Sequence, residues 1–168
     1  MRGLLIAGVV VAALTLQTTL AGLAFGGPAA PDLVLIVVVY VGLTRGPVTG
    51  VLAGSLAGLT QDALSGGVLG IGGLAKTVVG FLAGVLGTQF IMTAPLPRFV
   101  AFVGGTLVHA LVFMGLYTLL DLRRFPAPYV DALGQAIGNG FVGVIGTLLI
   151  EWVPEFLRRR RTRRPVRR

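Results

Sequence analysis

Residues 33–59 read LVLIVVVYVGLTRGPVTGVLAGSLAGL, two apolar runs divided by a Gly-Pro break at Gly46 and Pro47. The runs, Leu33–Leu43 and Val48–Leu59, show no alternation of apolar and polar residues, so they do not resemble strands of a membrane β-barrel. A run of this kind becomes a helix in lipid, where the backbone must satisfy its own hydrogen bonds. The sequence therefore predicts two membrane helices joined by a short turn.

The rest of the chain follows the same pattern. All nine prolines fall outside the long apolar stretches, where a missing backbone donor marks a helix boundary. Four more apolar runs lie between these boundaries: Leu4–Phe25, Val68–Met92, Phe99–Leu120 and Ala132–Val153. We predict an all-α integral membrane protein with a six-transmembrane-helix bundle over residues 1–157 and a basic tail over residues 158–168.

Composition supports a membrane protein. Of the 168 residues, 55% are hydrophobic and only 12% are charged, and the mean hydropathy is +0.91. A soluble domain of this size would carry far more charge. The absence of cysteine excludes disulfides, thiol catalysis and cysteine metal sites.

The second and third runs are short for membrane spans, which need about twenty residues. Extending them to Ala30–Thr44 and Gly46–Asp62 gives about 22 and 25 Å at 1.5 Å per residue. They are either short, tilted or sheltered spans, or a re-entrant hairpin. We expect an irregular, half-buried loop over Gln61–Gly73, which contains five glycines and one serine.

Charge predicts the orientation. Eight of the fourteen basic residues lie between Arg158 and Arg168, and termini rich in arginine stay in the cytoplasm. With six spans both termini are cytoplasmic, and Arg2, Arg45 and Arg98 fall on the same side. We also expect Met1–Phe25 to be a retained helix, because its apolar region is long and lacks a small-x-small cleavage site.

Small residues recur every fourth position in the central helices, an interval that places them on one helix face. Such faces allow another helix to approach closely. The predicted packing glycines are Gly50, Gly54, Gly58, Gly80 and Gly84.

Polar residues inside the predicted helices should face one another, because lipid cannot solvate them. The candidates for an intramembrane polar cluster are Gln17, Asp62, Lys76, His109 and Asn139. They either act as hydrogen-bonding glue in a packed bundle, which we favour, or line a polar cavity. For Asp62 and Lys76 we expect a salt bridge that closes the loop between them; the alternative is that Asp62 lies in wet headgroups or caps the turn.

Catalytic and metal-binding patterns are absent from the sequence. There is no phosphate-binding glycine loop followed by Lys-Ser/Thr, no HExxH and no GxSxG. His109 is the only histidine, so a metal site of the usual kind is not expected. We expect no enzymatic activity, metal or cofactor, and we assign the arginine-rich tail to topology and anionic lipids rather than nucleic acid.

The segment from Pro31 to Gly87 resembles the rod shape-determining protein MreD family. The resemblance rests on an ordered set of residues in and around the second to fourth runs: Pro31, Asp32, Tyr40, Arg45, Gly46, Gly54, Gly58, Asp62, Ser65, Gly66 and Gly70. The rest of the chain is similar in hydropathy only. Lys76 is a charge that we would not expect in this pattern.

The resemblance implies a bacterial inner-membrane component of the cell-elongation machinery. Its implied partners are a single-span MreC-like protein, an MreB-like filament, and the wall-synthesis glycosyltransferase and transpeptidase. It also implies a fold similar to the substrate-binding subunits of energy-coupling-factor transporters. The glycine faces would then suit docking of a partner helix.

Two functions stay open on the sequence alone. The first is a membrane scaffold that binds an MreC-type partner. The second is a small-molecule-binding membrane subunit of a transporter, with the polar cluster lining a cavity. A continuous polar pocket open to the outside favours the second, and a collapsed, glycine-packed interior counts against it.

Overall fold

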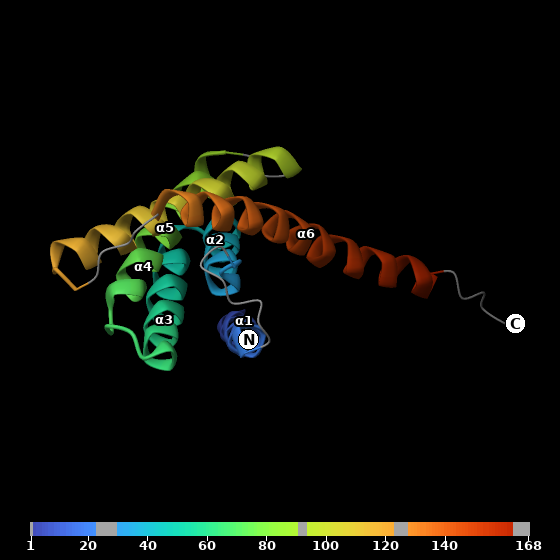
Figure 1. Ribbon diagram of the computed structural model, residues 1–168. Helices are drawn as coiled ribbons and strands as arrows, with labels where there is room; N and C mark the ends of the chain where they lie inside the picture. The colour runs from blue at the N-terminus through green and yellow to red at the C-terminus, as the bar shows by residue number, and fades with distance from the viewer. Residues whose placement is uncertain (1, 23–29, 91–93, 123–127, 163–168) are drawn as a thin grey trace, which may run out of the picture.

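The computed structural model describes residues 2–22, 30–90, 94–122 and 128–162, with side chains for 8–19, 30–90, 94–122 and 129–152. The described residues are folded into six α-helices (Figure 1). They are α1 (Arg2–Gly22), α2 (Leu33–Arg45), α3 (Pro47–Ser65), α4 (Ile71–Gln89), α5 (Pro95–Leu119) and α6 (Pro128–Thr162). The predicted all-α class is confirmed.

Helix α2 is the centre of the bundle and packs against each of the other five helices. Its side chains are apolar on every side, which is typical of a helix surrounded by protein. Val34, Leu35, Val38 and Val39 are all essentially inaccessible. With 13 residues α2 is only about 20 Å long. Its position among the other helices shelters this short helix.

The turn from α2 to α3 consists of Gly46 alone. Gly46 has φ 86°, a conformation that strains any residue with a Cβ, and its backbone N–H donates to the Gly42 carbonyl to end α2. Pro47 occupies the first turn of α3, where its missing N–H costs nothing. The Gly-Pro break in the sequence is therefore a tight helical hairpin.

Helices α3 and α4 meet backbone to backbone. A Cβ built on Gly50 would overlap the Gly80 carbonyl oxygen, and a Cβ on Gly80 would overlap that of Gly50. A Cβ on Gly54 would likewise overlap the backbone of Lys76, and a Cβ on Gly84 would overlap the backbone of Pro47. These glycines let two helices approach more closely than any side chain allows.

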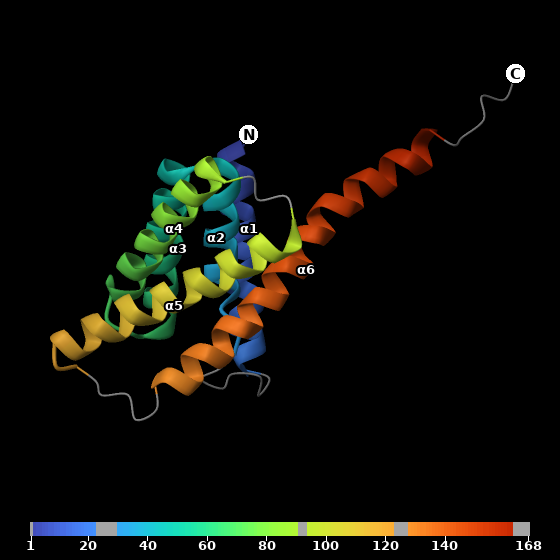
Figure 2. The same ribbon diagram turned by 90° about the horizontal axis from the view of Figure 1, so that it is seen from above.

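The remaining helices extend the bundle. In Figure 2, α5 lies obliquely across α4 and α6, and α6 runs far beyond the other helices. The same figure shows α1 beginning and α6 ending toward one side of the molecule, with the α3–α4 connection on the opposite side. The side of a membrane on which each of these helix ends lies stays a prediction.

Three helical stretches among the described residues are long and apolar enough to cross a membrane: Ile71–Gln89, Pro95–Leu119 and Tyr129–Trp152. Gly8–Thr19 and Leu33–Arg45 are shorter apolar helices. The last turns of α3 are polar (TQDALS), which lowers its hydropathy. The count of six spans stays a prediction.

Two sequence expectations need correction. The loop between the third and fourth helices covers only residues 66–70, because α3 continues to Ser65 and α4 begins at Ile71. Gly66 and Gly70 both adopt left-handed backbone conformations, which makes this short loop possible. Pro154 does not mark a helix boundary either, because α6 runs through it to Thr162.

Candidate functional site

Asp32 and Lys76 form a buried salt bridge at the start of α2. Asp32 is 6% exposed and Lys76 is 3% exposed. Lys76 Nζ lies 2.8 Å from Asp32 Oδ2. The other carboxylate oxygen, Oδ1, accepts a hydrogen bond of 2.9 Å from the Leu35 backbone N–H and so caps α2. One side chain thus caps the central helix and neutralises the lysine on α4.

Asn139 extends this contact to α6 and α5. Its Oδ1 accepts from the Asp32 backbone N–H at 2.9 Å, and its Nδ2 donates to Thr106 Oγ1 at 3.0 Å. Thr106 Oγ1 in turn donates to the Phe102 carbonyl at 2.8 Å. Asn139 and Thr106 are each 1% exposed, so these bonds are shielded from water.

Two glutamines hold the backbone on either side of Asp32. Gln17 Oε1 on α1 accepts from the Val34 backbone N–H at 3.2 Å, and Gln135 Nε2 on α6 donates to the Ala30 carbonyl at 2.9 Å. Three helices other than α2, namely α1, α4 and α6, therefore bond side chains to the start of α2, and α5 is connected to them through Thr106. In lipid such bonds replace the water that a helix end would otherwise need.

His109 lies beside the salt bridge, close enough to interact electrostatically with both Asp32 and Lys76. It is 8% exposed, and its ring packs on Phe113 with centroids 5.6 Å apart. Its Nδ1 is buried and has no hydrogen-bond partner among the described residues. We call Asp32, Lys76, Thr106, His109 and Asn139 the polar centre.

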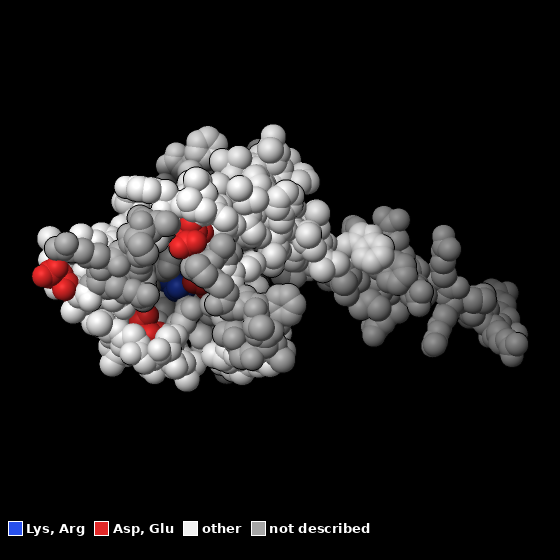
Figure 3. Space-filling view, viewed as in Figure 1, with Lys and Arg blue, Asp and Glu red and all other residues white. Residues whose placement is uncertain are grey.

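The polar centre lies deep within the fold. In Figure 3, a small patch of basic atoms lies recessed between acidic side chains on an otherwise largely uncharged face. No group of three or more His, Cys, Asp or Glu residues suited to a metal ion occurs in the described ranges.

The expected Asp62–Lys76 salt bridge was wrong. Asp62 Oδ2 accepts from the backbone N–H groups of Gly70 and Gly73, at 2.9 and 3.1 Å, and so closes the loop and caps α4. Gly70 precedes α4 and has no side chain to cap it, so the carboxylate from α3 supplies the missing acceptor. The structure instead shows the alternative that we gave for Asp62, in which its side chain caps the turn.

The structure therefore brings together Lys76, His109 and Asn139 of the expected cluster, with Gln17 nearby, and leaves Asp62 at the loop. Sequence reasoning did not assign Asp32 or Gln135 to this cluster, and it missed Thr106. Asp32 opens an otherwise uncharged apolar run, which is a signal that it pairs with the one lysine in the helices.

The residues that carry the resemblance to the family and lie outside the polar centre take part in helix packing or in the α3–α4 loop. Pro31 precedes the Asp32 cap and lies near Gly138 of α6. Tyr40 is partly buried against the core of α2, α4 and α5. Gly58 faces Gly72 and Gly73 in the α3–α4 contact, and Gly66 and Gly70 form the loop.

A second ion pair joins α5 and α6. Arg98 donates two hydrogen bonds to Glu151, at 2.9 and 2.6 Å. The paired, planar geometry favours arginine over lysine at this position. The Arg98 side chain is 10% exposed and that of Glu151 is 52% exposed, so one partner is accessible from outside.

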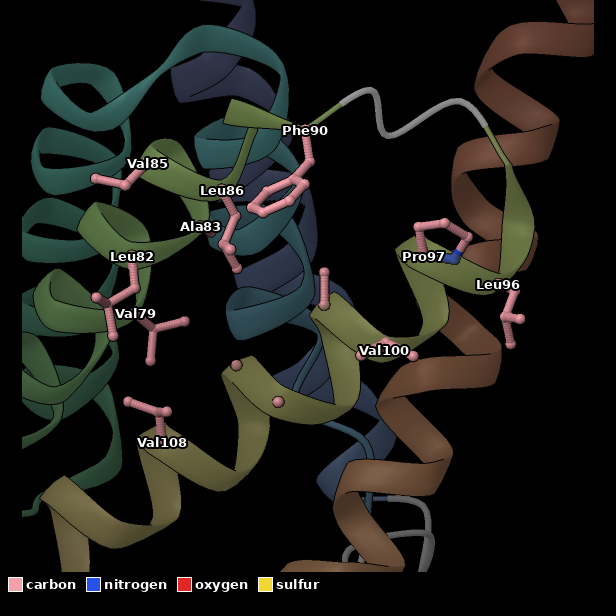
Figure 4. A pocket seen from close by; sticks show the side chains of 13 residues that line it. Val79, Leu82, Ala83, Val85, Leu86, Phe90, Leu96, Pro97, Val100 and Val108 are labelled. Carbon is pink, nitrogen blue, oxygen red and sulfur yellow. The ribbon is translucent and has the colours of Figure 1, made fainter. Parts of the chain in front are cut away.

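An apolar groove separates the end of α4 from the start of α5 (Figure 4). Its volume is about 690 Å³. Val79 and Leu86 of α4 line one side together with Phe90, which follows α4, and Val100 and Val108 of α5 line the other. Gly104 lies in its wall, and a Cβ built there would meet nothing within 4 Å.

The packing glycines do not face this groove. Gly50, Gly54, Gly58, Gly80 and Gly84 are all buried in contacts within the bundle. They are therefore unavailable to a partner helix, which corrects the expectation that the glycine faces serve for docking.

Comparison with known proteins gives one match. No curated protein and no solved structure matches the chain, so the expected likeness to energy-coupling-factor subunits stays a prediction. A family model described as rod shape-determining protein MreD matches residues 2–159, which include α1 to α5, most of α6 and every residue of the polar centre. The chain belongs to the rod shape-determining protein MreD family.

Proposed function

We propose that this protein is a non-enzymatic scaffold of the bacterial cell-elongation machinery in the inner membrane. The family match over residues 2–159 carries the proposal, since the family is defined by its role in rod shape. Its described charged side chains at buried positions are engaged with one another: Asp32 with Lys76, and Arg98 with Glu151. This arrangement favours structural support over chemistry.

The proposed partner is an MreC-like protein with a single transmembrane helix. The groove between α4 and α5 supports this choice, because it lies between two helices that are each long enough to cross a membrane. Its lining is almost wholly apolar, and Gly104 leaves room for close backbone approach. A partner helix in this groove would be held by van der Waals packing.

Both termini are proposed to lie in the cytoplasm. The arginine-rich end of the chain would then follow the positive-inside rule and contact anionic lipids, and the wall-synthesis enzymes and an MreB-like filament would be reached through the complex. The alternative of a small-molecule-binding subunit of a transporter gains less support, since glycine contacts fill the α3–α4 interface.

Complementation in the native rod-shaped bacterium tests the proposal. Depletion of the protein should convert rods into spheres, and re-expression of the wild-type chain should restore the rods. Normal shape after depletion, together with loss of uptake of one small solute, would support the transporter subunit instead.

A further inference from the structure

The polar centre contains hydrogen-bonding capacity that the described protein atoms do not use. His109 Nδ1 is buried with no partner among the described residues. Lys76 has three N–H donors, and its one bond in the described part of the chain is to Asp32. Buried polar groups in folded proteins almost always have partners, so both groups point to something that binds between them.

Charge balance limits what can bind. Asp32 and Lys76 neutralise each other, and Asn139 and Thr106 contribute no charge. A bound cation would lie beside the Lys76 ammonium, and a bound anion beside the Asp32 carboxylate. Either would add an uncompensated charge in a buried site, which is costly. A protonated His109 would also add an uncompensated charge, because it would place a second positive charge near Lys76. The ligand is therefore neutral.

The hydrogen-bonding groups of the polar centre further limit which neutral ligand can bind. The free N–H donors of Lys76 require an acceptor oxygen. A neutral imidazole presents its Nδ1 as either donor or acceptor, according to its tautomer. A hydroxyl group meets both needs, since its oxygen accepts from Lys76 and either donates to or accepts from His109.

We propose that the polar centre is a binding site for a neutral hydroxyl group, supplied by an ordered water or by the alcohol group of a small polyol. The hydroxyl bridges Lys76 Nζ and His109 Nδ1, and so joins α4 to α5 where no direct side-chain bond is described. This site is independent of the proposed scaffold function.

The single histidine makes the site measurable. The chain contains one histidine, so ¹⁵N-histidine labelling of the protein in lipid nanodiscs gives the signals of His109 alone. We expect the Nδ1 signal of the wild-type protein to show a hydrogen bond, with a cross-peak to a hydroxyl or water proton. A non-bonded Nδ1, or an Nδ1 bonded directly to Lys76 or to a backbone group, would overturn the proposal.

A paired substitution and a probe complete the experiment. In Asp32→Asn/Lys76→Met both charges are removed together and the asparagine retains a cap for α2, so we expect loss of the cross-peak with the fold retained. An unchanged cross-peak in that variant would contradict bridging by Lys76. Titration with glycerol distinguishes the sources: a saturable shift of Nδ1 identifies an alcohol, and a water cross-peak that glycerol leaves unchanged identifies water.

Discussion

Lys76 Nζ on α4 lies 2.8 Å from Asp32 Oδ2, the carboxylate that caps α2, and both side chains are almost completely buried. The charge that looked anomalous in the sequence thus neutralises the cap of the central helix. Asn139 and Thr106 then connect the same point to α6 and α5. The start of α2 is the position at which the helices of the bundle are joined by polar contacts.

Removing one charge of the buried pair should be strongly destabilising. Lys76→Met leaves the Asp32 carboxylate unpaired, and Asp32→Asn leaves Lys76 unpaired, so each should cost about 3–5 kcal/mol. The double variant should cost clearly less than the sum, since it leaves no lone charge. Thermal unfolding of the purified variants in detergent measures these effects.

The Arg98–Glu151 pair supplies the matched control. Glu151 is half exposed, so Glu151→Gln should change stability by about 1 kcal/mol or less. If the costs of the two single substitutions at Asp32 and Lys76 simply add in the double variant, the buried salt bridge does not contribute as described.

Alanine at the α3–α4 contact should force the two helices apart. A Cβ at position 50 overlaps the backbone of Gly80, so Gly50→Ala should cost at least about 1–3 kcal/mol, the usual range for overpacking. Gly115→Ala is the control, because a Cβ there meets nothing within 4 Å and alanine favours helix by about 1 kcal/mol. Opposite shifts in melting temperature are expected, and equal shifts would refute the close contact.

Loss of the Asp62 carboxylate should loosen the α3–α4 loop. Asp62→Ala removes the acceptor for the Gly70 and Gly73 N–H groups and should cost about 1–2 kcal/mol, as for other helix caps. Ser65→Ala, in the same exposed turn, should cost far less because Ser65 bonds only its own helix. Amide exchange at residues 66–73 reports the local effect; unchanged exchange in Asp62→Ala would argue against the cap.

Single cysteines test the orientation, because the native chain has none. Leu122→Cys lies beyond α5 and Thr88→Cys lies at the end of α4, and both positions are exposed. In intact spheroplasts a membrane-impermeant maleimide should label Cys at 122 and spare Cys at 88. The reverse labelling would place the termini outside.

The helices were predictable because apolar runs and proline boundaries act locally. The Gly46-Pro47 turn and the four-residue glycine spacing of α3 follow from the sequence in the same way. The C-terminal end of α3 was not predictable from the sequence. Its last turn is polar, and it is stabilised by the hydrogen bonds that Asp62 accepts from across the loop. These hydrogen bonds depend on the position, in the folded chain, of the residues at the start of α4, Gly70 and Gly73 among them.

The partner of Lys76 was not predictable from spacing. Asp62 is nearer in the sequence, but α2 packs on α4 and brings Asp32 to the lysine instead. The docking role expected for the glycines failed for a related reason: a small-residue face indicates a close helix contact and does not say whether the neighbour belongs to the same chain. The groove between α4 and α5 arises from the angle between two helices, which no residue pattern encodes.

Affinity purification of the tagged protein from native membranes in mild detergent tests the scaffold account most directly. Val100→Trp fills the groove, and Leu149→Trp introduces the same side chain at an equally apolar, exposed position outside the groove. We predict that wild type and Leu149→Trp recover an MreC-like protein with wall-synthesis enzymes, and that Val100→Trp loses the MreC-like protein. Recovery of that partner with Val100→Trp would contradict the docking site, and recovery of transporter ATPases without wall proteins from wild type would contradict the scaffold itself.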